Sequence, residues 1–327
     1  MKKDFILDNK LDFSNYKEAL DLIEKSRYIL IITHVNPDAD TISSALALSN
    51  LFYENKIKHK VFNVSSDLPQ NLNFINRFEK ITDQLPKFYD LAISVDCGLK
   101  KRLGFELPKE IPLINIDHHQ SNDDFGVINI VDSTKSSTAE IIYDFFKFNG
   151  LYITKHSATA LYTGIYDDSL RFSIGRCDEI TFEKANFLVK CGANPSFIAN
   201  KLIRRDSLAK YRVIPKVLNS LELFDEGKVA FIKAEPLWLK QTGAHIRDCE
   251  DALDMIMSIA IVQIAIFLRV VNNEIRVSAR SKGNIDISKV ISKFGGGGHA
   301  NAAGCSLDGT DLTKAKNMVL KEILETE

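Results

Sequence analysis

Three clusters of histidine and aspartate each come directly after a run of apolar, β-prone residues, and this arrangement restricts the folds open to the chain. A buried strand that ends in carboxylates and imidazoles places oxygen and nitrogen ligands at one edge of a sheet. Carboxylates held close together raise one another's pKa, so a bound divalent cation is the simplest way to stabilise them; two are expected where five or more ligands converge. The clusters are His34, Asp38 and Asp40 after residues 28–33, Asp96 after residues 91–95, and Asp117, His118 and His119 after residues 112–116.

Helical patterns alternate with these runs through the first 190 residues. The segment from Ser137 to Glu140 fits a capping box and opens a helix that ends near Lys147. The alternation predicts an α/β fold, with a mostly parallel sheet and helices on both faces. In such sheets ligands bind beyond the carboxyl ends of the strands, which is where the three clusters fall. The other helices expected here span 15–27, 41–55, 155–166 and 179–190.

The pattern changes near residue 190, where Cys191–Pro195 breaks the preceding helix. We therefore predict a catalytic domain over residues 1–188, a linker over 189–206, and a smaller α/β domain over 207–327. Two domains suit this length, because single cores stop growing near ~250–300 residues. The second domain is expected to contain strands at 228–233, 261–271 and 274–279, a helix near 247–258 and a last helix from about 311.

The charge balance excludes one class of partner. The chain carries 42 basic and 43 acidic side chains, whereas proteins that coat long duplex DNA carry a basic excess, so a nucleic-acid partner should be short. The five cysteines are scattered and form no C-x-x-C pair, which indicates reduced thiols. The N-terminus lacks the apolar stretch of a signal peptide, and the longest apolar run, residues 255–268, is too short to span a bilayer. We expect a soluble, cytoplasmic protein without a membrane partner.

The spacing of His34, Asp38 and Asp40 fits a turn between a strand and a helix, stiffened by Pro37, that aims all three side chains at one point. Aspartates also cap helices commonly, and for Asp38 and Asp40 alone that alternative stays open. Asp96 by itself is a weak signal, because strand-end aspartates are frequent turn formers. Its two oxygens nevertheless suit it to bridge two cations.

The triplet of Asp117, His118 and His119 is the sharpest local signal. One histidine can bind a metal while Asp117 orients or neutralises it, and the second can contact a phosphate or assist a proton transfer. The alternative, an exposed polar turn, fits poorly with the apolar run that the triplet closes. Two further carboxylates, Asp167 and Asp168, follow an apolar helix, and one of them would complete a second metal site.

Four glycines before His299 leave backbone amides uncovered, so an anion or a flat base can approach closely. The helix-like Ala300–Ala303 would add a positive dipole end. A glycine run alone is often only a flexible loop, but Ser278 and Arg280 precede it and supply a phosphate clamp. The second domain is therefore predicted to grip the substrate. Its candidate residues are Ser278, Arg280, Gly296, Gly297, Gly298 and His299.

These motifs resemble those of the DHH phosphoesterase superfamily, which is named for a triplet like the one at 117–119. The glycine run resembles the DHH-associated domain of the RecJ-like branch. Size and domain plan look most like the NrnA-type enzymes, cytoplasmic oligoribonucleases that degrade very short RNA and often remove the 3′-phosphate from pAp. The other matching metal motifs are, in order, His34-x-x-x-Asp38-x-Asp40, Asp96 and Asp168.

The resemblance implies two manganese ions, with magnesium or cobalt as substitutes. It places His119 beside the scissile phosphate, and the far part of the substrate on Arg280 and the His299 loop. The candidate catalytic residues are His119 and Asp117. The implied ligands are His34, Asp38 and Asp96 for one ion, and Asp40, Asp96, His118 and Asp168 for the other.

The resemblance also favours Asp168 over Asp167, because the family typically has Thr-Asp-Thr-Gly-x-Phe at this place. The chain departs from the family pattern at two positions. Ala39 replaces a common glycine, and Leu170 stands where glycine is usual. The rest of the signature is intact, so we expect an active enzyme.

We expect a metal-dependent phosphoesterase that hydrolyses very short RNA, including dinucleotides such as pGpG, to mononucleotides, and also pAp to AMP. The rivals are a phosphodiesterase of linear or cyclic dinucleotide messengers, and a pyrophosphatase or exopolyphosphatase, whose second domain lacks the glycine-rich motif. A non-catalytic nucleotide-binding module would need a broken metal set. A homodimer is a further expectation, since residues 259–270 suit either an internal strand or a dimer edge.

Overall fold

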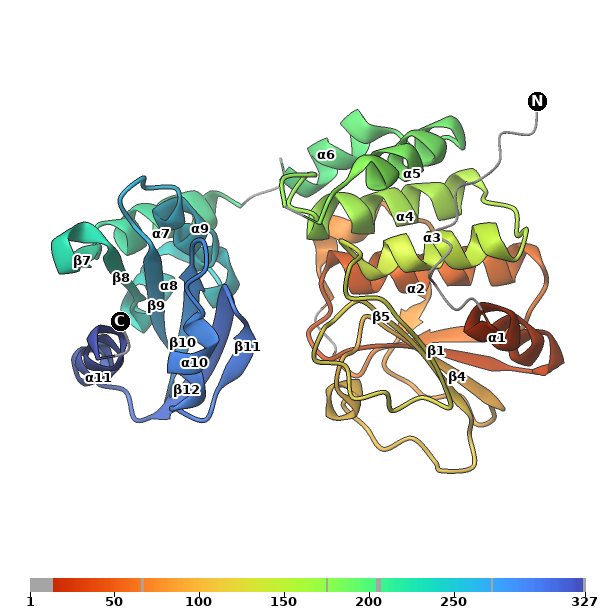
Figure 1. The fold of residues 1–327 in the computed structure, drawn as a ribbon, viewed down its shortest axis with the longest axis horizontal. Helices are drawn as coiled ribbons and strands as arrows, with labels where there is room; N and C mark the ends of the chain where they lie inside the picture. Colours follow the sequence, from red (N-terminus) through yellow and green to blue (C-terminus); the bar gives the residue numbers. More distant parts are fainter. Residues whose placement is uncertain (1–13, 66–67, 175, 204–206, 272, 326–327) are drawn as a thin grey trace. The chain divides into compact units, whose positions relative to one another are not determined.

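A computed structural model describes residues 14–65, 68–174, 176–203, 207–271 and 273–325. The chain divides into two compact units, Met1–Arg205 and Asp206–Glu327, and each is described by itself (Figure 1). All three clusters of histidine and aspartate belong to the first unit, and the glycine run belongs to the second.

A parallel six-stranded sheet in the order β3-β2-β1-β4-β5-β6 forms the centre of the first unit. β1, β4 and β5 are buried along their whole length, as expected for isoleucine-rich strands covered on both faces. Because Thr33 pairs with Val95, and Val95 with Ile116, the carboxyl ends of these strands are level. The strands are β1 (Ile29–Thr33), β2 (His59–Phe62), β3 (Ile81–Thr82), β4 (Leu91–Val95), β5 (Leu113–Asp117) and β6 (Ile128–Val131).

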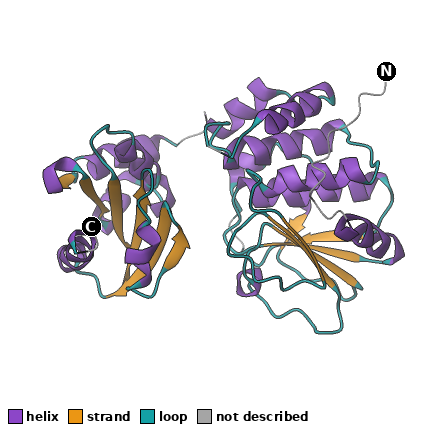
Figure 2. Ribbon diagram, in the orientation of Figure 1, coloured by secondary structure: helices purple, strands orange, loops and turns teal. Residues whose placement is uncertain are grey.

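The α-helices of this unit gather on one face of the sheet (Figure 2). The other face carries a smaller apolar cluster, in which Leu103 and Leu107 cover Ile32. The predicted α/β class is confirmed, and on this second face a 3-10 helix and a loop stand where α-helices were expected. The helices are α1 (Ser14–Lys25), α2 (Ala39–Glu54), η1 (Gln70–Leu72), η2 (Phe78–Lys80), η3 (Lys100–Leu103), α3 (Thr138–Phe148), α4 (Lys155–Asp168), α5 (Glu179–Lys190) and α6 (Pro195–Ile203).

The segment predicted as a linker, residues 189–206, contains the end of α5 and all of α6. α6 packs against α4, so this part of the chain belongs to the first unit, which extends to Arg205. Residues 204–206 lie outside the described residues.

A mixed six-stranded sheet in the order β11-β12-β10-β9-β8-β7 forms the centre of the second unit. Only the β8–β9 pair is parallel. β9 is paired on both sides, so it is an internal strand and offers no free edge; the homodimer stays a prediction. The elements are α7 (Leu208–Leu218), β7 (Glu222–Phe224), β8 (Val229–Ala234), α8 (Pro236–Thr242), η5 (Ile246–Cys249), α9 (Asp251–Met257), β9 (Ile264–Val271), β10 (Glu274–Ser281), α10 (Ile287–Ser292), β11 (Gly297–His299), β12 (Ala302–Asp308) and α11 (Leu312–Leu324).

The expectation of a helix-like Ala300–Ala303 is wrong. Gly297–His299 forms the short strand β11, which turns back and pairs with the start of β12. β12 in turn pairs along its whole length with β10. Pairing with β10 therefore overrides the helix propensity of this alanine-rich stretch, so Ala300–Ala303 does not itself supply a helix end to His299.

Candidate metal centre

Ligand atoms from three loops converge beyond the carboxyl ends of β1, β4 and β5. Nε2 of His34 lies 3.6 Å from Oδ2 of Asp96 and 3.9 Å from Oδ2 of Asp38. The three residues offer ligand atoms that all lie within 4.8 Å of one another. This spacing fits donors that share one cation at about 2.1 Å from each.

A second group lies on the other side of Asp96. Nε2 of His118 is 3.6 Å from Oδ1 of Asp96 and 3.4 Å from Oδ2 of Asp168, and Asp40 completes the set. Asp168 thus meets His118, while its neighbour Asp167 is in neither group. One oxygen of Asp96 faces each group, and this is the arrangement that a carboxylate needs to bridge two cations.

The N-terminus of α3 fixes Asp40. Oδ2 of Asp40 accepts a hydrogen bond of 2.7 Å from the backbone N–H of Thr138, and Oδ1 accepts one of 3.0 Å from Ala139. Gly164 of α4 lets the chain pass close by, because a Cβ there would lie 2.6 Å from Oδ1 of Asp40. The first turn of a helix favours negative charge, so α3 offsets part of the cost of burying this carboxylate.

The backbone and two hydroxyls fix Asp96. Its φ of 56° lies in the left-handed region, which aspartate tolerates better than most residues, and its N–H donates to the carbonyl of Ile116. The hydroxyl of Thr41 donates to Oδ2 at 2.5 Å and that of Thr138 to Oδ1 at 3.0 Å. Each carboxylate oxygen therefore faces one threonine and at least one histidine.

The surroundings of Thr41 show why a cation fits the first group. Its hydroxyl oxygen lies 2.5–2.9 Å from Nε2 of His34, Oδ1 of Asp38 and Oδ2 of Asp96. Nδ1 of His34 lies 2.7 Å from the carbonyl of Val35, which can only accept, so Nε2 carries the free lone pair. Arg102 also approaches this nitrogen, at 3.1 Å, but the carbonyl contact is shorter. One hydroxyl proton cannot serve three acceptors, whereas a cation would satisfy all of them.

Asp38 has two roles that the sequence left as alternatives. It is the N-cap of α2, and its Oδ1 accepts a hydrogen bond of 3.0 Å from the backbone N–H of Thr41. The same side chain belongs to the ligand group of His34 and Asp96. Capping and ligation are thus compatible here, because the cap uses one carboxylate oxygen and leaves the other directed at His34.

Mutual repulsion of carboxylates dominates the electrostatics. Burial raises the pKa of Asp40 well above its usual value, and the charges of Asp96 and Asp168 raise it further. Burial and the charges of Asp96 and Asp38 likewise raise the pKa of Asp168 to about 8. Burial acts in the same sense on Asp96, but contact with His34 and the charges of His118 and His119 outweigh it and lower its pKa. Without cations, the centre thus holds protons on carboxyl groups that would otherwise be ionised.

His119 and Asp117 form a hydrogen-bonded pair, and His119 also belongs to a third group of possible metal ligands, with Asp96 and His118. Nδ1 of His119 lies 2.7 Å from Oδ1 of Asp117, a fully buried carboxylate whose second oxygen accepts from Asn122. Burial disfavours the charged imidazole, but the hydrogen bond to Asp117 and the charge of Asp96 outweigh burial and raise the pKa of His119 to about 9. His119 also lies 3.6 Å from Oδ1 of Asp96. Asp117 therefore orients a protonated imidazole at the edge of the centre.

Sequence patterns missed the two threonines. Thr41 lies three residues after Asp38, and the capping pattern at Ser137 located the start of α3, with Thr138 as its first residue. Neither pattern told which distant carboxylate the hydroxyl would meet. The sequence therefore indicated only that each threonine lies in the first turn of a predicted helix.

The substrate residues predicted in the second unit lie on or beside two strands, β10 and β11, which flank β12. Ser278 and Arg280 of β10 pair with Gly304 and Ala302 of β12, and Gly297 of β11 pairs with Gly304 from the other side. Gly296 precedes β11, which contains Gly298 and ends at His299. The structure thus brings these residues to one end of one sheet.

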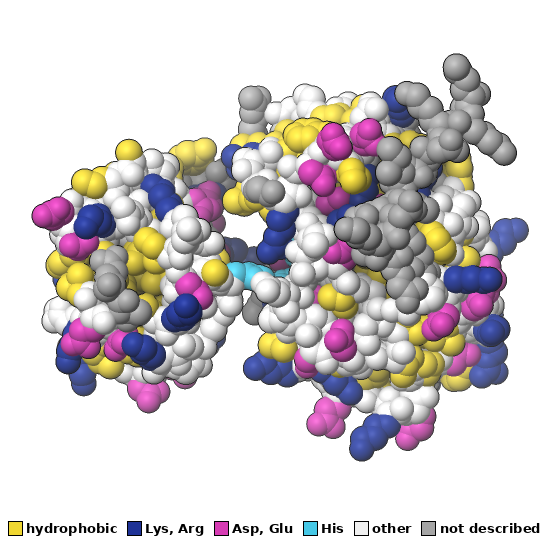
Figure 3. All heavy atoms as spheres, viewed as in Figure 1, with side chains coloured by type: hydrophobic (Ala, Val, Ile, Leu, Met, Phe, Trp, Pro, Cys, Tyr) yellow, Lys and Arg dark blue, Asp and Glu magenta, His cyan; other side chains and the backbone are white. Residues whose placement is uncertain are grey.

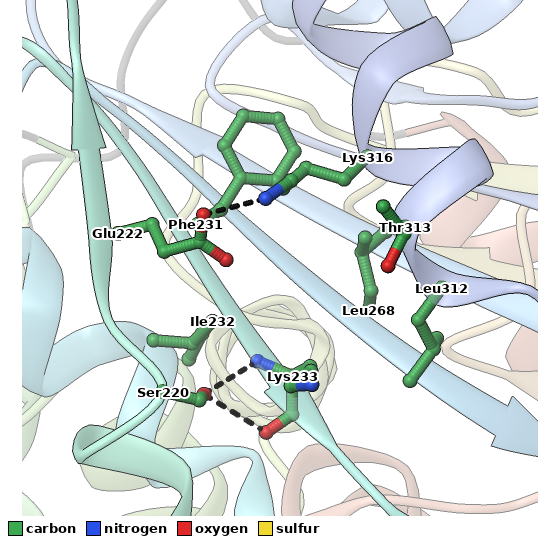
Figure 4. Close-up of a pocket in the computed structure, with 9 residues that line it drawn as sticks. All are labelled: Ser220, Glu222, Phe231, Ile232, Lys233, Leu268, Leu312, Thr313 and Lys316. Atoms are coloured by element: carbon green, nitrogen blue, oxygen red, sulfur yellow. Dashed lines mark hydrogen bonds and ion pairs between the residues drawn. The ribbon is translucent and has the colours of Figure 1, made fainter.

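Two surface features lie outside the centre. A cavity of about 30 Å³ in the second unit, large enough for about one water, is lined by an ion pair of Lys316 with Glu222 and by Ser220, which bonds the backbone of Lys233 (Figure 4). None of its lining residues is a ligand candidate. Acidic and basic side chains alternate over the visible faces of both units (Figure 3), in keeping with the balanced charge.

Comparisons with known proteins agree with this geometry. Residues 28–165 match the family profile "DHH family, N-terminal domain", and residues 227–325 match the "DHHA1 domain". A Thermus thermophilus relative named bifunctional oligoribonuclease and PAP phosphatase NrnA is 30% identical over 94% of this chain and 92% of its own length.

Solved structures share the fold. An exopolyphosphatase-related protein from Bacteroides fragilis superposes with a TM-score of 0.88 at 24% identity, covering 98% of this chain and 100% of its own. RecJ from Thermus thermophilus in complex with Mn2+ superposes with a TM-score of 0.57 at 14% identity, covering 94% of this chain and 54% of its own. Among the described residues, no helix combines the length and apolar character needed to cross a bilayer.

Proposed function

Because the chain belongs to the DHH phosphoesterase family and is a nucleotide phosphoesterase, we propose that it hydrolyses very short RNA to mononucleotides and pAp to AMP. The names of its relatives support this substrate class. The balanced charge supports it as well, because it leaves little capacity to hold a long polyanion. The cytoplasm is the compartment that we propose for it.

The observation that carries the proposal is the position of Asp96 between two ligand groups. Its Oδ2 faces His34 and its Oδ1 faces His118, each at 3.6 Å. We assign one cation to His34, Asp38 and Asp96, and a second to Asp40, Asp96, His118 and Asp168. The oxygen-rich donor set suits manganese or magnesium, and we propose manganese.

Two divalent cations bound at this centre would acidify a water and neutralise charge on the reacting phosphate. The residues of the chain supply the rest. α3 holds Asp40 in place, and Thr41 and Thr138 fix the two oxygens of Asp96. This preorganisation means that the ligands need little rearrangement when the phosphate arrives.

His119 is the residue that we assign to the phosphate. Its Nδ1 bonds Asp117, so its Nε2 carries the proton that can face a phosphate oxygen or the leaving oxygen. In the metal-free protein, the hydrogen bond to Asp117 and the charge of Asp96 raise the pKa of His119 to about 9 despite its burial. A charged donor of this kind binds a phosphate more strongly than a neutral one and can transfer its proton to a departing alkoxide.

The second unit is assigned to the part of the substrate away from the reacting phosphate. Arg280 and Ser278 supply a cation and a hydroxyl, and nothing lies within 4 Å of a Cβ built on Gly297, so a flat base can approach the backbone there. Exposed His299 adds a further donor. These roles follow from the residue types and their common end of one sheet.

A substrate panel tests the proposal. The full chain would be incubated with manganese and a dinucleotide, pAp, a long RNA or a cyclic dinucleotide, and products would be separated by chromatography. We expect the dinucleotide and pAp to be hydrolysed fastest. Release of mononucleotides from long RNA as fast as from the dinucleotide would overturn the short-substrate claim. Manganese-dependent hydrolysis that survives Asp96→Asn would overturn the assigned centre.

A further inference from the structure

Among the described residues, the helices on one face of the second unit's sheet lie mainly over β8 and β9. Helices α7 and α9 pack on β8 and β9, where Ile232 and Phe267 contribute to a buried apolar cluster. On the same face, β10 and β12 continue the sheet with residues that are exposed or half-buried, such as Arg276 and Ser306. A ligand can therefore reach the backbone of these strands beside the wall made by α9.

Two arginines face each other on this open half. Arg276 of β10 is the direct cross-strand partner of Arg269 of β9. Arg280 lies on the same face of β10, four residues further along, which corresponds to about 14 Å. Like charges directly opposite each other destabilise a sheet, so this pair needs a compensating group.

Arg269 is held rigidly in this position. Its Nη1 donates a hydrogen bond of 2.8 Å to the hydroxyl of Ser278, and its guanidinium stacks 5.0 Å from the ring centre of Phe267. Glu250 approaches Nη2 at 3.5 Å, and the side chain is only 13% exposed. The contact with Ser278 directs this guanidinium along β10, from the Arg276 end towards Arg280.

Acidic side chains compensate only part of this charge. Glu250 is the one acidic group paired with Arg269, and no ion pair joins Arg276 or Arg280 to an acidic side chain within the part of the chain that the structure describes. Burial lowers the pKa of Arg269, the charge of Glu250 raises it, and the charges of Arg276 and Arg280 lower it again. An anion bound between them would relieve the repulsion.

The floor beside the arginines is free of long side chains. Opposite Arg276 and Arg280 on β12 stand Ser306 and Ala302, with Gly304 between them. A bound phosphate and its sugar would therefore meet backbone and small side chains on one side and guanidinium groups on the other. Fixed guanidinium forks beside an open floor match the geometry that phosphate groups need.

We propose that Arg269 and Arg276 form a second phosphate subsite, continuous with Arg280, so that the protein prefers substrates that carry a further phosphate besides the one that is cleaved. The inference deepens the proposed function and rests on it. The further phosphate has two sources, the 5′-terminal phosphate of a short nucleotide or the next internal phosphate of a slightly longer RNA.

The test uses Arg276→Gln, because this side chain is exposed on the face of the sheet. Binding of ApA, pApA and ApApA to the full chain would be measured by calorimetry in EDTA, which prevents turnover. We expect wild type to bind pApA, ApApA or both more tightly than ApA. The affinity of the variant should be about tenfold lower than that of wild type for those ligands, and less than about twofold lower for ApA.

The salt dependence gives a second readout that a structural role would not move. The slope of log affinity against log salt for pApA should become shallower by about 0.7 in Arg276→Gln, as expected for one lost phosphate contact on a single strand. The matched control is Lys321→Gln on α11, an exposed cation away from this face that should change neither quantity. If Arg276→Gln loses affinity for pApA alone, the ligand of the subsite is the terminal phosphate. If it loses affinity for ApApA alone, the ligand is the internal phosphate.

The inference is overturned if Arg276→Gln binds all three ligands as wild type does, or weakens ApA as much as pApA. Hydrolysis of bis-p-nitrophenyl phosphate with manganese separates this failure from failure of the proposed function. If wild type cleaves this small ester but Arg276→Gln binds all three ligands as wild type does, the subsite is wrong and the catalytic assignment stands. Wild type that cleaves neither the ester nor pApA would remove the catalytic assignment.

Discussion

The backbone N–H of Thr138 donates a hydrogen bond of 2.7 Å to the carboxylate of Asp40, although 98 positions separate the two residues. The contact joins the first turn of α3 to the first turn of α2. It means that packing among α2, α3 and α4, and not only the turn after β1, sets the direction of a candidate metal ligand.

Gly164→Ala tests this dependence. An added methyl would lie 2.6 Å from Oδ1 of Asp40 and 2.7 Å from Cβ of Ala139, so α4 or the carboxylate must move. We expect manganese affinity to fall about tenfold and unfolding free energy to fall by about 1–3 kcal/mol. Calorimetry and urea denaturation measure the two. Gly297→Ala, where a Cβ meets nothing within 4 Å, should change neither quantity; unchanged manganese affinity in Gly164→Ala would contradict the role of the packing.

Thr41→Val should weaken the first cation site. The change removes the hydroxyl that fixes Oδ2 of Asp96 and keeps the shape of the side chain. Loss of a partner that orients a metal ligand typically costs ~10–100-fold in affinity. Manganese titration followed by electron paramagnetic resonance should show one of two sites weakened, and Thr41→Ser should restore it. Tighter binding in the valine variant would mean that the hydroxyl obstructs the cation instead.

A rise in pH should strengthen manganese binding and lower the stability of the metal-free protein. The pKa of Asp168 is raised to about 8 in the folded, metal-free protein, from an ordinary value of 3.8, so the folded state binds a proton that the unfolded state has lost. Stability of the metal-free protein should therefore fall as pH rises from about 4 to about 8. Manganese must displace the same proton, so its affinity should rise over this range and binding should release protons.

Urea unfolding in EDTA at several pH values, and calorimetry in buffers of different ionisation enthalpy, measure these effects. Asp168→Asn removes the titrating group and should flatten the pH dependence of stability. Metal-free stability that rises through the same pH window would contradict the assignment.

Leu170→Gly should stabilise the protein. Leu170, Arg171 and Phe172 follow α4 with φ of 47°, 65° and 62°, the left-handed region that costs a non-glycine residue about 1–2 kcal/mol. Leu170 is 62% exposed, so its side chain contributes little packing. We expect a gain of about 1 kcal/mol in urea denaturation, with manganese affinity unchanged. Leu170→Ala keeps the strain and should show no gain; an equal gain from alanine would place the effect in the side chain.

The sequence predicted the centre well where local pattern and sheet geometry coincide. Clusters that follow β1, β4 and β5 meet because parallel strands end at one edge, so the approach of His34, Asp96 and His118 follows from their positions after strands. The departure at Leu170 does not displace Asp168, because the backbone adopts the left-handed turn without glycine.

The features that the sequence did not predict depend on contacts between segments far apart in the chain, which no local pattern encodes. Ala300–Ala303 has helix-forming composition, but pairing with β10 places its second half in a strand. The partners of Thr138 come from distant segments, and the opposition of Arg269 and Arg276 follows from strand register. Register and helix packing are settled only when the whole unit folds, so single residues gave no signal of them.

The ligands of the centre span most of the first unit, from His34 after β1 to Asp168 at the end of α4. During synthesis, the histidine that opens the set leaves the ribosome more than a hundred residues before the aspartate that closes it. The candidate ligand set is therefore complete only after α4 has emerged, so cations can meet the whole set only late in synthesis.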